Sequence, residues 1–397
     1  MFKYSIKNLR EEDKNFFKDM IPYLSQYIIK YEMKEGDVFI YCDVDNENQI
    51  RNCLDNLINM INKNILSEKT EKIKTIEDYT SYTTINHSNI YNNLVSRGDV
   101  RELAKGSFAY SGLFLDIYEY FERKIDEFAC SKFKNIRKIV YPDLHSIQDY
   151  IKGRYFENFP HYMMFQTTLK NDMSVYEKFS KCKFEYKSIL DEIKTPQNVL
   201  RHAACVPVYS LLENEMLDAE EVQSFIVSGK CFRNEEDNIF ELSRLNEFYM
   251  KEFVLVGDEN AVNKMIEISK ELIKFWVDIF KLNSKYETAN DSFFANNYKK
   301  MKFFQIIGES KQEFKAFIPG NKNYIAASSI NYHRTHFSKV YNIIGEKGNY
   351  CYSACFAFGI ERLAYALLSQ KGLNIDKWDF ETIKEIEKYS KLRSNEK

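Results

Sequence analysis

The stretch that decides the fold lies between Ser224 and Gly257 and reads FIVSGKCFRNEEDNIFELSRLNEFYMKEFVLVG. Two apolar runs flank a long polar segment, which predicts two antiparallel strands joined by a long loop. The first strand ends in Phe232-Arg233-Asn234-Glu235, and Arg244-Leu245-Asn246-Glu247-Phe248 opens the second. The planar guanidinium of arginine matches phosphate oxygens bidentately, and a rigid strand holds it in place. The hairpin therefore indicates a phosphate site, although a solvated strand with salt bridges gives the same residue types.

A second pattern lies downstream of the hairpin. The residues Phe358-Gly359-Ile360-Glu361-Arg362-Leu363 read as a strand that runs into a helix. Arg362 then lies near a helix N-terminus, where the backbone dipole also favours anions. An ordinary surface arginine in the first turn of a helix is the alternative interpretation.

Further elements place this hairpin in an antiparallel sheet. Apolar residues recur every three or four positions from Leu113 to Phe128, which predicts a long helix, and a strand KIVY follows and ends at Pro142. Strand-like runs occur at KMKFFQIIG, QEFKAFIP, YIAASSI and CYSACFAFG. Few strands alternate regularly with helices, so a doubly wound parallel sheet is disfavoured. We predict an α+β fold with an antiparallel sheet flanked by helices.

The first part of the chain reads as a separate module. Strand-like and helix-like pieces alternate there: FKYSIKNL, a helical NFFKDMIPYLSQYIIK, VFIYCDV and QIRNCLDNLINMINKNIL. This order predicts a small α/β module. Polar residues from 65 to about 96 read as a connector. We therefore divide the chain into a module with its connector, residues 1–96, and a main domain, residues 97–397.

Composition limits the partners and the location. The 397 residues carry a formal net charge of -2 and a pI near 6.4, which argues against a strongly electropositive surface and disfavours tRNA as a partner. The chain shows no signal-peptide pattern and no run of about eighteen apolar residues, so we expect a cytoplasmic protein without a membrane span. Eight cysteines without CxxC spacing do not suggest a disulfide framework.

These patterns together resemble a known family. The two arginine-bearing patterns resemble motifs 2 and 3 of class II aminoacyl-tRNA synthetases, and residues 113–142 resemble motif 1, which implies a homodimer. The segments GSFAYSGLF, GRYFENFPHYM, AACVPVY, DSFF, ASSINYHRTHFSKVY and ACFAFGIERLAYAL look like the amino acid:carrier protein ligases, relatives of methanogen-type seryl-tRNA synthetases. This resemblance runs from about residue 97 to 376.

The resemblance implies a role for each motif residue toward ATP. Arg233 would grip the α-phosphate, and Arg362 would meet the γ-phosphate. Glu235 would read the adenine edge, Arg244 would hold the β- and γ-phosphates, and Phe248 would stack on the base.

The resemblance also implies substrate contacts and two metal ions. Ser329 and Asn331 occupy positions of substrate and magnesium contacts, but the acidic residue that many synthetases carry before them is replaced by Ile325, Ala326 and Ala327. The family's zinc ligands correspond to Cys205, Glu252 and Cys355, although both cysteines alone read as small buried residues. Cys351 is a rival ligand that does not match the family position. His333 and His336 read as structural or as lining the pocket.

The implied function is ATP-dependent activation of a small amino acid, such as glycine, alanine or serine. The aminoacyl group of the adenylate would pass to the phosphopantetheine thiol of a separate carrier protein. Two alternatives stay open, an atypical seryl-tRNA synthetase and a non-catalytic synthetase paralogue.

Overall fold

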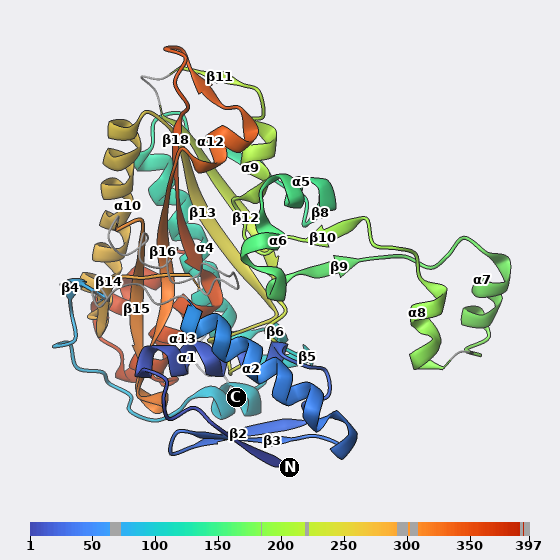
Figure 1. Ribbon diagram of the computed structural model, residues 1–397. Helices are drawn as coiled ribbons and strands as arrows, with labels where there is room; N and C mark the ends of the chain where they lie inside the picture. The colour runs from blue at the N-terminus through green and yellow to red at the C-terminus, as the bar shows by residue number, and fades with distance from the viewer. Residues whose placement is uncertain are drawn as a thin grey trace.

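An eight-stranded sheet forms the centre of the structure (Figure 1), a computed structural model that describes residues 1–63, 73–183, 185–218, 222–291, 301, 309–389 and 392. Neighbouring strands are antiparallel except for the parallel pair of β12 and β7 at one edge. In spatial order the strands are β4 (Thr75–Asp78), β14 (Ser284–Thr288), β15 (Lys311–Ile318), β16 (Asn323–Arg334), β18 (Tyr352–Gly359), β13 (Glu247–Gly257), β12 (Gln223–Phe232) and β7 (Arg137–Val140). The predicted antiparallel sheet is confirmed.

The two strands of the diagnostic hairpin pair along their whole length. β12 and β13 are antiparallel neighbours, from Gln223 opposite Val256 to Phe232 opposite Glu247. The polar loop between them contains a 3-10 turn, η5 (Glu236–Asn238). The predicted long-looped hairpin is therefore confirmed, and most of the predicted strand KMKFFQIIG lies outside the described residues.

Three helices cover one face of the sheet: α4 (Gly112–Lys132), α10 (Glu259–Phe280) and α13 (Ile360–Lys371). Their apolar stripes pack on Phe253 and Leu255 of β13 and on Phe356 and Phe358 of β18. The Asp258 carboxylate starts α10 by accepting the backbone N–H of Ala261. In Figure 1, α4 lies behind the strands and α10 stands at their left. The opposite face of the sheet is not covered by these three helices.

Smaller elements surround the opposite face and the ends of the sheet. The helices among them are α3 (Tyr91–Arg97), α5 (Ile147–Lys152), α6 (Tyr155–Asn158), α9 (Val206–Leu211), α12 (His336–Tyr341) and α14 (Phe380–Ile386). The strands among them are β5 (Val100–Ala104), β6 (Ser107–Tyr110), β8 (Leu144–Ser146), β11 (Met216–Leu217) and β17 (Ile344–Gly345). α9 and α12 belong to an apolar cluster with Phe225, Val254 and Val256 of the sheet.

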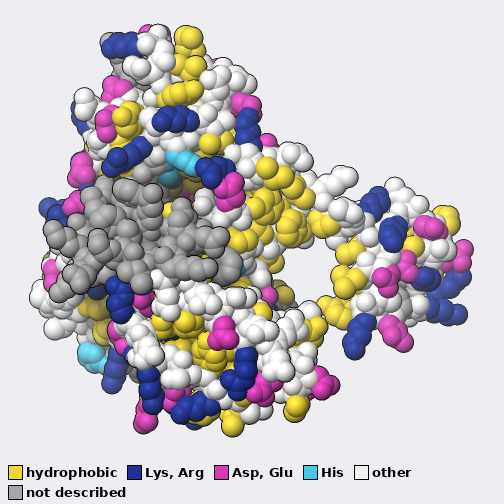
Figure 2. Space-filling view, in the orientation of Figure 1, with side chains coloured by type: hydrophobic (Ala, Val, Ile, Leu, Met, Phe, Trp, Pro, Cys, Tyr) yellow, Lys and Arg dark blue, Asp and Glu magenta, His cyan; other side chains and the backbone are white. Residues whose placement is uncertain are grey.

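An arm projects from the body of the molecule (Figure 1). It leaves through β9 (Met164–Gln166), carries α7 (Met173–Ser180) and α8 (Ile189–Glu192), and returns through β10 (Asn198–Leu200). Figure 2 shows the arm standing away from the body, with acidic, basic and hydrophobic side chains on the visible face.

The N-terminal residues form a unit with its own core. A sheet of order β1-β3-β2, with β1 (Phe2–Ser5), β3 (Asp37–Tyr41) and β2 (Lys30–Lys34), packs on α1 (Glu11–Met20) and α2 (Glu47–Lys63). The predicted helix over residues 15–30 is too long, because the chain forms the 3-10 turn η1 (Ile21–Tyr23) after Met20. Pro22 lies in that turn, and a proline disrupts a continuing α-helix. β4, within the predicted connector, pairs with β14 of the main sheet.

Every helix in the described part of the chain is too short or too polar to cross a membrane.

The junction of sheet and helix at motif 3 contains a buried acid. Glu361, in the first turn of α13, is 1% exposed, and its carboxylate accepts the backbone N–H of Tyr249 on β13 at 2.9 and 3.0 Å. Burial raises the pKa of Glu361 from 4.5 to about 7. The folded state therefore keeps a proton that the unfolded chain loses between these pH values, and stability falls as the pH rises through that window.

We expect Glu361→Gln to remove this pH dependence, because glutamine keeps an acceptor for Tyr249 and cannot ionise. Between pH 4 and pH 8 the variant should gain about 3 kcal/mol in free energy of unfolding relative to the unsubstituted protein. Denaturant unfolding at several pH values measures this, with Glu346→Gln, at an exposed position, as the control for loss of a negative charge. A difference between the two proteins that is constant with pH would contradict the assignment.

Candidate active site

A cavity of about 570 Å³ opens on the face of the sheet opposite the three long helices. Strands β13, β16 and β18, the start of α9 and the first turn of α13 contribute to its wall. All ten residues singled out from the sequence line it: Cys205, Arg233, Glu235, Arg244, Phe248, Glu252, Ser329, Asn331, Cys355 and Arg362. The structure thus brings together residues that lie up to 157 positions apart in the chain, from 205 to 362.

The strand register explains why these side chains share one face. Side chains alternate between the two faces of a strand, and directly opposite residues share a face. Asn331 of β16 lies opposite Cys355 of β18, and Ser329 lies opposite Ala357. Ala357 in turn lies opposite Glu252 of β13. Two adjacent rows of the sheet therefore direct Asn331, Cys355, Ser329 and Glu252 into the same cavity.

Two thiols and a carboxylate meet at one end of the cavity. The sulfur atoms of Cys205 and Cys355 and a carboxylate oxygen of Glu252 all lie within 4.8 Å of one another, and all three residues are buried. Glu252 Oε1 accepts the backbone N–H groups of Ala204 at 2.9 Å and Cys205 at 3.0 Å. These two bonds fix the direction of the carboxylate and connect β13 to the start of α9.

The donor set suits a zinc ion. Thiolate and carboxylate are ordinary zinc ligands, and three protein ligands leave a further coordination position open, as in catalytic sites. The hydrogen bond with Cys355 and burial raise the pKa of Cys205, and burial raises the pKa of Glu252. Three acidic groups this close cannot all ionise at low cost without a cation. The residues therefore fit the group that the family resemblance implies, and zinc stays a prediction.

Two arginines line the other end of the cavity. The Arg233 guanidinium lies 5.4 Å from the ring centre of Tyr162 and 5.1 Å from that of Phe248, and its Nε donates to the His202 carbonyl at 3.1 Å. Arg362 Nη1 donates to the Ala326 carbonyl at 2.9 Å. Burial and the nearby Arg233 lower the pKa of Arg362. Two partly buried positive charges that line one cavity form a binding site for an anion.

A third arginine is held by acids. Arg244 Nε donates to Glu235 Oε2 at 2.6 Å, and Glu235 is only 3% exposed. Asn246 supports this pair, because its side-chain oxygen accepts the backbone N–H of Glu235 at 2.8 Å. Arg244 and Glu235 are expected to contact phosphate and adenine respectively, and in this structure they pair with each other.

Near the cluster lie His333 and His336, which the sequence suggested are structural or line the pocket, and Cys351, the rival ligand. His333 and His336 line the cavity. The Nδ1 atom of His333 lies 3.0 Å from the Tyr209 hydroxyl, and its Nε2 lies 3.8 Å from the Cys355 sulfur. Burial lowers the pKa of His333 to about 3, so the ring is neutral near pH 7. Cys351 is buried in the apolar cluster around Tyr209 and Phe337.

Asp19, Tyr162 and Glu313 are among the residues that line the cavity and that the sequence did not indicate. Glu313 of β15 lies opposite Ser329 of β16, so an acid faces the cavity although none precedes Ser329 in the chain. In the sequence, Lys311, Glu313 and Lys315 stand at every second position, and this spacing places their charged side chains on one face of a strand. For Asp19 and Tyr162 we find no comparable signal in the sequence.

Comparisons with known proteins define the class. Residues 183–371 match the family model described as tRNA synthetase class II core domain (G, H, P, S and T). A solved structure of M. kandleri SerRS in complex with A. aeolicus tRNASec aligns with a TM-score of 0.70 and 19% identity over 100% of this chain and 79% of that chain. A serine-tRNA ligase from Naegleria fowleri in complex with AMP aligns with a TM-score of 0.57 and 9% identity, over 82% and 68% of the two chains. Residues 183–371 are thus similar to a class II aminoacyl-tRNA synthetase core domain, and the chain has the class II synthetase fold.

Two sequence relatives are type-2 serine–tRNA ligases. The type-2 serine–tRNA ligase of Methanocaldococcus jannaschii is 26% identical over 290 residues, which cover 69% of this chain and 54% of the relative. The enzyme of the same name from Methanopyrus kandleri is 22% identical over 374 residues, or 87% and 71% of the two chains. The chain is homologous to methanogen-type serine–tRNA ligases, and it spans about half the length of the first of these relatives.

One expectation from composition is wrong. The net charge disfavoured tRNA as a partner, yet the relatives are serine–tRNA ligases and one structural neighbour is bound to tRNASec. Net charge is a sum over the whole surface, whereas nucleic acid needs only a local basic face.

We expect zinc content to depend on the three clustered residues. Cys205→Ala, Cys355→Ala and Glu252→Ala should each lose most of the zinc, because each removes one of three protein ligands. Cys351→Ala is the matched control and should keep it, since Cys351 lies four residues from Cys355 in the apolar cluster. Metal analysis of the purified variants gives the answer.

Zinc affinity should also fall as the pH is lowered, because the thiols bind metal only after losing their protons. Equal zinc content in all four variants, or an affinity that does not change with pH, would contradict the ligand assignment.

Proposed function

We propose that this chain uses ATP to activate a small amino acid, with serine as the first candidate, and transfers the aminoacyl group to tRNA. The observation that carries the proposal is a single cavity that is lined both by the partly buried Arg233 and Arg362 and by the Cys205, Glu252 and Cys355 cluster. An aminoacyl-adenylate has the matching order of groups, with a phosphate next to an amino acid. The serine–tRNA ligase names of the relatives support serine and tRNA.

In the first step the amino acid carboxylate attacks the α-phosphorus of ATP, and pyrophosphate leaves. Arg233 contacts the α-phosphate and stabilises the charge that develops on its oxygens, while Arg362 neutralises the departing phosphates. The two aromatic rings and the His202 carbonyl hold Arg233 in position before the substrate arrives. The protein needs no general base, because the carboxylate is already ionised at neutral pH.

The cluster recognises the amino end of the substrate. Cys205, Glu252 and Cys355 would hold the zinc ion, and bound zinc supplies an open position for an unprotonated amine. Asn331 donates to the Cys355 sulfur at 3.7 Å and lies beside the same wall, so it orients the thiol and meets the substrate. Discrimination against one extra methylene is worth about 1–3 kcal/mol, so glycine and alanine compete with serine to a limited extent.

ATP and magnesium are typical of class II synthetases, and the bound nucleotide would carry magnesium here. Glu313 is the acid that the register places opposite Ser329. We propose that Glu313 supplies the negative charge that the stretch Ile325-Ala326-Ala327 lacks. Glu235 reads the adenine edge, Arg244 contacts the β- and γ-phosphates from its place beside Glu235 and Asp19, and Phe248 stacks on the base.

The activation step is tested by ATP–pyrophosphate exchange with each amino acid. We expect the fastest exchange with serine, followed by alanine and glycine. Arg233→Ala should lower the exchange rate constant about 10²–10³-fold, because it removes a preorganised donor to the transition state. The exposed Arg123→Ala on α4 is the control and should exchange normally. Exchange that is fastest with a large side chain would refute the substrate, and no exchange with intact ATP binding would identify a non-catalytic paralogue.

The acceptor is tested separately. We expect transfer of labelled serine to total tRNA, because the relatives act on tRNA by name. Transfer to the phosphopantetheine thiol of a carrier protein is the alternative outcome, and its support is limited to sequence segments such as GSFAYSGLF and AACVPVY. Labelling of a carrier protein with no labelling of tRNA would refute the proposed acceptor while leaving the activation step intact.

A further inference from the structure

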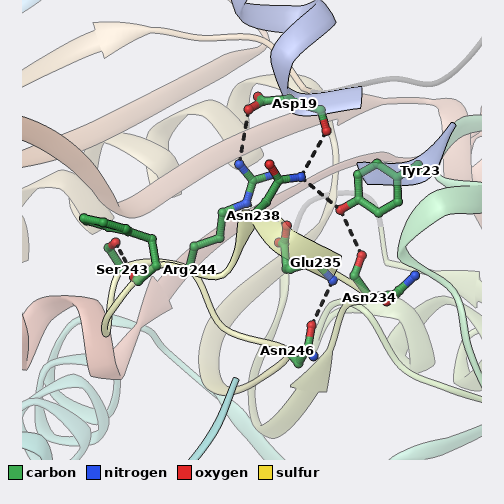
Figure 3. Close-up of polar contacts among 9 residues, drawn as sticks. Asp19, Tyr23, Asn234, Glu235, Asn238, Ser243, Arg244 and Asn246 are labelled. Carbon is green, nitrogen blue, oxygen red and sulfur yellow. Dashed lines mark hydrogen bonds and ion pairs between the residues drawn. The ribbon is translucent and has the colours of Figure 1, made fainter. Parts of the chain in front are cut away.

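The N-terminal unit contacts the loop between β12 and β13 next to the loop residues that line the cavity (Figure 3). The Tyr23 hydroxyl donates to the Asn234 carbonyl at 3.0 Å, directly between Arg233 and Glu235 in the chain. The Asn238 side-chain amide donates to the Asp19 carbonyl at 3.0 Å and to the Tyr23 hydroxyl oxygen at 3.5 Å. These bonds join residues more than 200 positions apart, so they are tertiary contacts that local sequence does not produce.

A charge contact accompanies these hydrogen bonds. Asp19 lies at the end of α1, and its Oδ1 is 3.5 Å from Arg244 Nη1. Arg244 Nε is also bonded to Glu235 (Figure 3), so one guanidinium contacts an acid from the loop and an acid from the N-terminal unit. Asp19 itself lines the cavity.

Tyr23 also contacts His161, the residue next to Tyr162, which lines the cavity. Its ring meets the His161 ring edge-on, with centres 5.1 Å apart. His161 precedes Tyr162, whose ring lies against the Arg233 guanidinium. Burial raises the pKa of Tyr23, so its hydroxyl keeps the proton that it donates. A single side chain thus connects the loop that carries Arg244 with the segment that supports Arg233.

We propose that Asp19 and Tyr23 are positioning residues of the nucleotide site: they order the β12–β13 loop before ATP binds. A loop that must be ordered during binding costs free energy that lowers affinity, whereas a loop already held in place does not. The N-terminal unit is then part of the nucleotide site and not merely an appended module. This inference rests on the proposed function, since it assumes that the cavity binds ATP.

The test is direct binding of a non-hydrolysable ATP analogue to the full chain. Tyr23→Phe removes one hydroxyl and keeps the ring against His161. Loss of a hydrogen bond worth about 1 kcal/mol should weaken nucleotide binding about fivefold. In pyrophosphate exchange the KM for ATP should rise by a similar factor, while the KM for the amino acid stays unchanged. A merely structural role would not affect one substrate alone.

Tyr4→Phe is the matched control. The Tyr4 hydroxyl donates to Asp55 at 2.6 Å within the N-terminal unit and therefore has the same chemistry away from the loop. This variant should bind the nucleotide like the unsubstituted protein. If Tyr23→Phe also binds normally, or if both variants weaken binding equally, the inference is overturned.

A double-mutant cycle adds a second test. Asn238→Ala removes the other partner of Tyr23, and the double variant should bind the analogue about as well as the weaker single variant, because both changes break one network. Fully additive losses would overturn the network. An unsubstituted protein that binds no nucleotide would refute the proposed function, whereas normal binding that is insensitive to Tyr23 would refute only this inference.

Discussion

Antiparallel pairing of β16, β18 and β13 determines which side chains reach the cavity. Because opposite residues share a face, one register places Asn331, Cys355 and Glu252 together and turns Phe356 and Phe253 toward the covering helices. A slip by one residue would exchange these two sets and bury charged groups in the apolar core. The same hydrogen bonds that hold the sheet together therefore define the chemistry of the site.

The strand register also places the acidic groups and the arginines in different parts of one cavity. The thiol and carboxylate groups lie where β13, β18 and α9 meet, and the arginines lie where the strands end and loops or helices begin. Three of the charged groups are held by backbone contacts: Glu252 by two amides, Arg233 by the His202 carbonyl and Arg362 by the Ala326 carbonyl. A site whose charges are fixed in advance suits a reaction that depends on positioning and electrostatics.

Local pattern predicted much of this arrangement. The apolar runs on either side of FRNE and RLNEF predicted the hairpin, and the change from strand to helix at Gly359 is found where motif 3 indicated it. The class II fold is confirmed, and the ten residues singled out line one cavity, although their roles are proposals.

What the sequence could not predict depends on long-range contacts. Asp19 and Tyr23 follow no motif, and their meeting with Arg244 and Asn234 depends on how two separately cored units pack. Glu313 reaches the cavity through cross-strand pairing with Ser329, which cannot be derived from either strand alone. The net charge of the chain gave a wrong answer on tRNA, because a sum over all residues contains no information about their distribution.

One ligand should span the cavity from the thiol cluster to the arginines. A crystal structure with a non-hydrolysable analogue of seryl-adenylate would show whether it does. We expect the amine of the analogue beside Cys205, Glu252 and Cys355, the phosphate substitute beside Arg233, and the adenine beside Glu235. An analogue bound in the opposite direction, or outside this cavity, would refute the proposed site.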